Sequence, residues 1–196
     1  MTLDTGYFDG MYEESADPWG FQSRWYEQRK YALTLAALPR RRYADAFEPG
    51  CSIGVLTALL AERCDRLFAC DTSTAAVEQA RRRAPGARVE RRTMPQDWPD
   101  GRFDLIVLSE LLYYFDDHDL ATMLDRAVNA LNPGGTLLAV HWRHPVPDYP
   151  HTGDDVHRAL ARTPLNCLVS HTEPDFLCEV FVQGEPTSVA TAEGLV

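Results

Sequence analysis

An acidic residue, a glycine-rich turn and a second acid follow one another near residue 50 at a spacing that suits nucleoside recognition. The turn Glu48-Pro49-Gly50-Cys51-Ser52-Ile53-Gly54 stands between two apolar segments, and Asp71 comes 21 residues after Gly50. Such a loop passes beneath a ligand, and a carboxylate at the end of the next strand accepts hydrogen bonds from ribose hydroxyls. We therefore expect a nucleoside-binding site formed by this loop and Asp71.

The residue types in the loop discriminate between nucleoside ligands. A dinucleotide site needs a glycine where this chain has Ser52, because the backbone must approach a pyrophosphate closely. Glu48 has the wrong sign for a phosphate but suits an ammonium group. S-adenosylmethionine carries an ammonium and a ribose and no phosphate, so these residues favour it over a nicotinamide dinucleotide.

The elements that must position these residues alternate between strand and helix. Short apolar segments bounded by turn residues predict strands over residues 43–47, 67–70, around 89, 103–108 and 136–141. Helices are expected from the glycine loop to about residue 62, from about residue 74 to 83, and over 119–131. The nearly continuous apolar segment 103–108 is typical of a strand buried on both faces of a parallel sheet.

The two ends of the chain differ from this alternating pattern. Segments 165–172 and 176–183 are joined by Glu173-Pro174-Asp175, which is too short for a crossover, so they must pair antiparallel. Helices are expected over 6–15 and 23–38, and we interpret residues 1–40 as a helical lid. Residues 41–184 then form an α/β core and 185–196 a tail, within one domain of 196 residues.

Composition limits the partners and the compartment. The net charge of −10 lacks the basic surface that nucleic acids or anionic membranes need, so neither is an expected partner. The polar, acidic start does not look like a signal peptide, and no apolar segment approaches 18 residues. Five cysteines without a C-x-x-C motif favour a reducing, cytoplasmic setting and no metal site. The oligomeric state stays open.

On these motifs the chain resembles the class I S-adenosylmethionine-dependent methyltransferases from about residue 43 to 183. Beside the glycine loop and Asp71, the resemblance rests on two further segments: Phe103-Asp104-Leu105-Ile106-Val107-Leu108-Ser109-Glu110 and Leu131-Asn132-Pro133-Gly134-Gly135. It implies a Rossmann-like seven-stranded sheet of order 3-2-1-4-5-7-6, with strand 7 antiparallel and helices on both faces.

A narrower resemblance is to the nodulation protein S (NodS)-like methyltransferases. It rests on Asp17-Pro18-Trp19, on Tyr26-Glu27-Gln28-Arg29-Lys30 and on Ser109-Glu110-Leu111-Leu112-Tyr113-Tyr114. It implies N-methylation of an amino sugar or a similar small polar metabolite. Segment 141–157 departs from the namesake's pattern, so the acceptor is not carried over. O-methylation of a small metabolite and a non-catalytic cofactor-binding module remain the alternatives.

The resemblance also implies roles for individual residues around S-adenosylmethionine. Glu48 and the Gly50 backbone would meet the ammonium, Asp71 the ribose and Thr72 the adenine, while Lys30 would meet the carboxylate. The expected cofactor-binding residues are Trp19, Tyr26, Lys30, Glu48, Gly50, Cys51, Ser52, Gly54, Asp71, Thr72, Met94, Pro95, Gln96, Ser109, Glu110 and Tyr114. For Lys30 the alternative is a solvated surface lysine.

The sequence constrains the acceptor site less than it constrains the cofactor site. His141, at the end of the fifth strand, is the expected base, with Tyr114 and Glu110 beside it; the alternative is a buried histidine hydrogen-bonded to backbone. Residues expected to contact the acceptor are Tyr113, Trp142, His144 and Tyr149. The His141/His144 pair has no matching carboxylate pattern, so no metal is expected.

Overall fold

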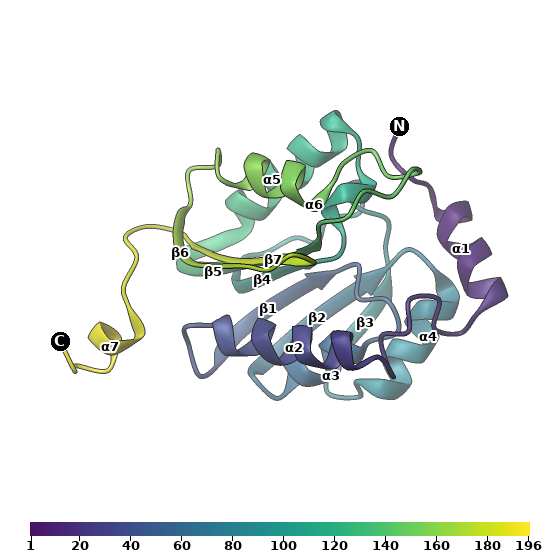
Figure 1. Cartoon of the computed structure of the whole chain (residues 1–196). Coiled ribbons are helices and arrows are strands. Elements are labelled where there is room, and N and C mark those ends of the chain that lie inside the picture. Colours follow the sequence, from purple (N-terminus) through teal and green to yellow (C-terminus); the bar gives the residue numbers. More distant parts are fainter.

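The computed structural model, which describes residues 1–196, has a seven-stranded sheet of order β3-β2-β1-β4-β5-β7-β6 (Figure 1). The strands are β1 (Tyr43–Pro49), β2 (Cys64–Asp71), β3 (Arg88–Arg91), β4 (Phe103–Ser109), β5 (Leu131–Trp142), β6 (Asn166–Thr172) and β7 (Phe176–Val182). The pairs among β1 to β5 are all parallel, and β7 runs antiparallel to both β5 and β6. The expected order and the antiparallel seventh strand are confirmed.

Helices cover both faces of the sheet. Figure 1 shows α2 (Trp25–Ala37), α3 (Val55–Ala61) and α4 (Thr74–Arg83) on one face, and α5 (Asp117–Ala130) and α6 (Gly153–Leu160) on the other. Helix α1 (Thr5–Glu14) lies beside α4 at the end of the sheet, and a short 3-10 turn, η1 (Leu112–Tyr114), follows β4. None of the helices is long and apolar enough to cross a membrane.

The central strands place their side chains alternately in two apolar cores. In β4, Leu105 and Val107 pack with the α2 and α3 side, whereas Ile106 and Leu108 pack with the α5 side. All four side chains are fully buried. This alternation follows from the two-residue repeat of a strand, and it explains why the segment reads as nearly continuous hydrophobic sequence.

Several boundaries differ from the sequence-based expectation. Helix α6 was not expected; Thr152 and Asp155 form a capping box that starts it. Helix α5 begins at Asp117, because Asp116 accepts hydrogen bonds from the N–H groups of His118 and Asp119. Strand β5 already begins at Leu131, and a register shift opposite β4 accommodates the glycines before Thr136. The tail contains one short helix, α7 (Val189–Ala192).

Candidate active site

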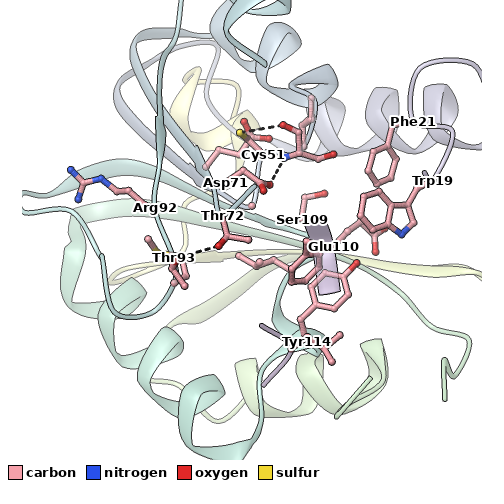
Figure 2. A pocket seen from close by; sticks show the side chains of 18 of the residues that line it. Trp19, Phe21, Cys51, Asp71, Thr72, Arg92, Thr93, Ser109, Glu110 and Tyr114 are labelled. Atoms are coloured by element: carbon pink, nitrogen blue, oxygen red, sulfur yellow. Dashed lines mark hydrogen bonds between the residues drawn. The ribbon is translucent and has the colours of Figure 1, made fainter. Parts of the chain in front are cut away.

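Two cavities lie side by side at the carboxyl ends of the strands. The first encloses about 960 Å³ including its open mouth, and it is bounded by the segments after β1, β2, β3 and β4 and by α1. The second, of about 990 Å³, lies between the start of α2, η1 and the segment after β5. They share four wall residues: Trp19, Phe21, Glu110 and Tyr114. Figure 2 shows these four residues on one side of the first cavity and Asp71 and Thr72 on the other.

The glycine loop is hydrogen-bonded to Asp71. Ser52 adopts a φ of 49° and donates its N–H to Asp71 Oδ2 at 2.8 Å (Figure 2). The N–H of Ser73 donates to Asp71 Oδ1 at 3.0 Å. Gly50, with φ 72°, passes so close to Leu111 that a Cβ would lie 2.8 Å from the leucine Cδ1. The loop therefore needs glycine at this position to fit under the first cavity.

Glu48 is a buried carboxyl group in the wall of the first cavity without a hydrogen-bond partner for Oε2. Burial raises the pKa of Glu48 to about 8. Burial also raises the pKa of Asp71, although its backbone donors oppose this. An uncompensated buried carboxyl is costly, so a cationic group at Glu48 would satisfy the cavity.

Helix α1 closes the first cavity. The hydroxyls of Tyr12 and Ser52 hydrogen-bond at 2.6 Å, and those of Thr5 and Thr72 also at 2.6 Å. Phe8 packs edge-on against Tyr114 with ring centroids 5.0 Å apart. Three turns of one helix are thus attached to the loop after β1, the turn after β2 and η1.

Glu110 stands between the two cavities and uses both carboxylate oxygens. Oε1 accepts from Lys30 Nζ at 2.6 Å, and Oε2 accepts from Tyr113 OH at 2.5 Å and from the N–H of Trp142 at 2.9 Å. Glu110 has a left-handed φ of 52°, which these contacts hold in place. Since three donors already bind its carboxylate, Glu110 organises the wall and is poorly placed to accept a proton from a ligand.

Lys30 lines the second cavity rather than the first and is only 2% exposed. Its Nζ lies 2.9 Å from Glu27 Oε2 as well as 2.6 Å from Glu110 Oε1. Burial disfavours its charge, but the two carboxylates outweigh burial and raise the pKa of Lys30. The alternative of a solvated surface lysine is wrong, and the ammonium expected to meet a ligand carboxylate is engaged by two protein carboxylates.

His141 is fully buried and lines neither cavity, so its position does not support a role as base. Leu112 donates its N–H to Nε2 at 3.3 Å, which leaves the proton on Nδ1 to be donated to His157 Nε2 at 3.1 Å. His157 Nδ1 then donates to Glu179 Oε2 at 2.7 Å. Burial holds the pKa of His141 well below its usual value. The alternative interpretation, a buried histidine hydrogen-bonded to backbone, matches this geometry.

The other expected site residues divide between the cavities. The first cavity contains Trp19, Glu48, Gly50, Cys51, Ser52, Asp71, Thr72, Met94, Ser109, Glu110 and Tyr114. The second contains Trp19, Tyr26, Lys30, Glu110, Tyr113, Tyr114, Trp142 and Tyr149. Neither contains Gly54, Pro95, Gln96, His141 or His144. His144 is half-exposed and its Nε2 lies 2.8 Å from Asp175, whereas a Cβ on Gly54 would lie 2.7 Å from Ala80 Cα, so Gly54 serves helix packing.

Sequence reasoning missed several wall residues. Those of the first cavity include Thr5, Tyr12, Phe21, Tyr31 and Arg92, and those of the second include Arg24, Glu27 and Asp175. Tyr12 shares a helical stripe with Phe8, and Glu27 precedes Lys30 by one helical turn, so both signals were present in the sequence. No group of three or more His, Cys, Asp or Glu side chains is arranged to hold a metal ion.

The family model described as nodulation protein S matches residues 12–151. The nodulation protein S of Rhizobium tropici is 32% identical over 127 residues, which cover 62% of this chain and 53% of that protein. The aligned part therefore spans about half the length of this relative.

Two solved structures extend the comparison. A putative methyltransferase from Pseudomonas syringae is 54% identical, with a TM-score of 0.72 over 81% of this chain and 99% of that one. The N-methyltransferase NodS from Bradyrhizobium japonicum WM9, in complex with S-adenosyl-L-homocysteine, is 25% identical, with a TM-score of 0.83 over 93% of this chain and 100% of that one.

Proposed function

Since this chain belongs to the nodulation protein S family, we propose that it is an S-adenosylmethionine-dependent methyltransferase that N-methylates an amino sugar or a similar small polar metabolite. The observation that carries the proposal is the buried carboxyl of Glu48, whose Oε2 has no hydrogen-bond partner, in a cavity that shares a wall with a second one. The first cavity would take the cofactor and the second the acceptor.

The residues of the first cavity fit S-adenosylmethionine. Glu48 would hold the ammonium, and Asp71, fixed by two backbone N–H groups, would accept from the ribose. Gly50 leaves the space that a side chain would fill. No phosphate-binding feature is needed, and Glu48 in its charged form would repel a phosphate.

The reaction needs alignment more than acid–base chemistry. When bound, S-adenosylmethionine supplies an activated methyl group on a sulfonium. Trp19, Phe21 and Tyr114 stand where the two cavities meet, and Trp19 and Phe21 stack with centroids 5.4 Å apart. Aromatic faces stabilise a cation, so these residues would hold the sulfonium and orient the reacting groups.

An amine acceptor agrees with the chemistry of the second cavity. No histidine lines either cavity, and a hydroxyl acceptor depends more on a base than an amine does. The wall of the second cavity also has three acidic residues, Glu27, Glu110 and Asp175, against two basic ones, Arg24 and Lys30, and this excess of acid favours a cationic ligand. Tyr26, Trp142 and Tyr149 add aromatic faces on which a sugar ring can stack.

Calorimetric titration with S-adenosylhomocysteine tests the cofactor, with NADH as the control ligand. We expect micromolar binding of S-adenosylhomocysteine alone, lost in Asp71→Ala and kept in Asp125→Ala, which changes an exposed carboxylate on α5. Binding of NADH instead, or of neither ligand, would contradict the proposal. Mass spectrometry of methylated acceptors would then separate N- from O-methylation.

A further inference from the structure

The second cavity has one negative charge more than its protein partners compensate. Its wall contains the cations Arg24 and Lys30 and the acids Glu27, Glu110 and Asp175. Glu110 accepts from three donors, and the half-exposed Asp175 faces His144. Lys30 is shared between Glu27 and Glu110, so its single charge cannot neutralise both.

Glu27 is the buried acid of this cavity with the fewest donors, since Arg24 acts on it without forming an ion pair. Its side chain is 8% exposed and its only close donor is Lys30, whose Nζ lies 2.9 Å from Oε2. A buried carboxylate normally receives two or more donors, so Glu27 retains the capacity to accept from a ligand. In contrast to Glu110, Glu27 forms no ion pair other than the one with Lys30.

Tyr26 adds a second unused polar atom next to Glu27. Its hydroxyl is buried without a hydrogen-bond partner. Its ring stands edge-on to Trp142, with centroids 5.5 Å apart, and both residues line the second cavity. A carboxylate, a hydroxyl and two aromatic rings in one cavity are the groups that bind an organic ammonium.

We propose that Glu27, oriented by Lys30, selects the acceptor by binding a positively charged amine in the second cavity, with Tyr26 as an auxiliary hydrogen-bonding group. The bound ammonium gives its proton to solvent before its nitrogen, then neutral, accepts the methyl group. This assignment rests on the proposed function, because it takes the second cavity as the acceptor site. Glu27 is a specificity-determining residue in this arrangement, and Glu110 keeps the wall between the cavities in place.

Binding of matched probes at saturating S-adenosylhomocysteine tests the assignment. The probes are glucosamine, tyramine and putrescine, each compared by calorimetry with its N-acetyl or mono-N-acetyl derivative, which removes one positive charge. We expect the wild type to bind at least one amine ten or more times more tightly than its acetylated derivative. Glu27→Gln should lower that amine's affinity at least tenfold and abolish the preference.

Two further variants separate a specific contact from general electrostatics and from misfolding. Asp175→Asn changes the charge of the same cavity by the same amount and should weaken the amine less than threefold. Tyr26→Phe changes no charge and should weaken it about threefold. In each variant S-adenosylhomocysteine affinity within twofold of wild type shows that the fold and the first cavity are intact.

The outcomes distinguish this assignment from the proposed function. If wild type binds S-adenosylhomocysteine but prefers no amine to its acetylated derivative, or if Glu27→Gln and Asp175→Asn weaken the amine equally, Glu27 is not the selecting residue. If wild type does not bind S-adenosylhomocysteine, the proposed function itself fails.

Discussion

Lys30 Nζ lies 2.6 Å from Glu110 Oε1, and this ion pair joins α2 to the residue that follows β4. The contact spans 80 positions of the chain. It places a helix from the N-terminal segment against the wall shared by the two cavities. The site is therefore assembled from the core sheet and the N-terminal helices together.

Replacement of Lys30 by methionine should destabilise the protein by about 3–5 kcal/mol, because Glu27 and Glu110 would remain buried without a cation. Adding Glu27→Gln to Lys30→Met removes one of these uncompensated charges and should recover about 1 kcal/mol or more. Chemical denaturation of the single and double variants measures both effects. Purely additive losses would show that the three side chains do not form one cluster.

The same variant tests whether Lys30 contacts the cofactor. Because Lys30 does not line the first cavity, S-adenosylhomocysteine affinity of folded Lys30→Met should stay within threefold of wild type. A loss greater than tenfold in a folded variant would restore the expected contact with the ligand carboxylate.

Local patterns predicted the fold better than they predicted the partners of single residues. The glycine loop, Asp71 and the apolar alternation of β4 belong to short segments whose geometry follows from their own sequence. The three-residue connection after β6 forced an antiparallel pair, and the family resemblance supplied the strand order, which the topology confirms. The resemblance to nodulation protein S is likewise confirmed by the family match.

The roles expected for Lys30 and His141 depended on partners that the sequence does not reveal. Glu110 and His157 are brought to them by the sheet and by α6, an element that was not expected. Burial of an ionisable side chain depends on the tertiary structure. The sequence alone therefore does not show that a basic helix residue is buried beside acidic partners. Glu27 is a further case. It belongs to the segment Tyr26-Glu27-Gln28-Arg29-Lys30 on which the family resemblance rests, but only the fold shows that its carboxylate lines the second cavity.

Binding of S-adenosylhomocysteine should tighten as pH rises through the neutral range. Burial raises the pKa of Glu48 to about 8, so at pH 6 the carboxyl is protonated and cannot pair with the ligand ammonium. Each unit of pH below 8 then costs about tenfold in affinity. Calorimetry at pH 6, 7 and 8 should show this slope in wild type and a flat profile in Glu48→Gln. An equal slope in both proteins would assign the pH dependence to another group.

The stability of the ligand-free protein should show the opposite trend. A carboxyl whose folded pKa exceeds its unfolded value near 4.5 favours the native state less and less as pH rises toward 8. The cost reaches on the order of 5 kcal/mol at pH 8 and is absent below about pH 4. Thermal unfolding of Glu48→Gln should therefore show a gain over wild type that grows between pH 5 and pH 8.

His141 should contribute to acid sensitivity rather than to proton transfer. Its folded pKa lies well below the unfolded value of 6.5, so the unfolded chain takes up a proton that the native chain cannot. Stability is then lost as pH falls below 6.5, by up to about 1.4 kcal/mol per pH unit. His141→Asn should reduce this loss between pH 7 and pH 5 in urea unfolding, while the pH profile of methyl transfer keeps its wild-type shape. If the pH profile of methyl transfer loses one limb in His141→Asn, His141 takes part in proton transfer.

Helix α1 should control how fast the cofactor leaves. The Tyr12–Ser52 and Thr5–Thr72 hydrogen bonds hold this helix against the first cavity, so we expect opening of these bonds to speed the release of a bound ligand. Tyr12→Phe removes one of these bonds, which is worth about 1 kcal/mol, and should speed dissociation of S-adenosylhomocysteine about fivefold. Tyr7→Phe is the matched control, because Tyr7 lies on the same helix but lines neither cavity. Stopped-flow fluorescence, with Trp19 in the cavity wall as the reporter, measures the rate. Equal dissociation rates in wild type and Tyr12→Phe would mean that α1 covers the cavity without restraining the ligand.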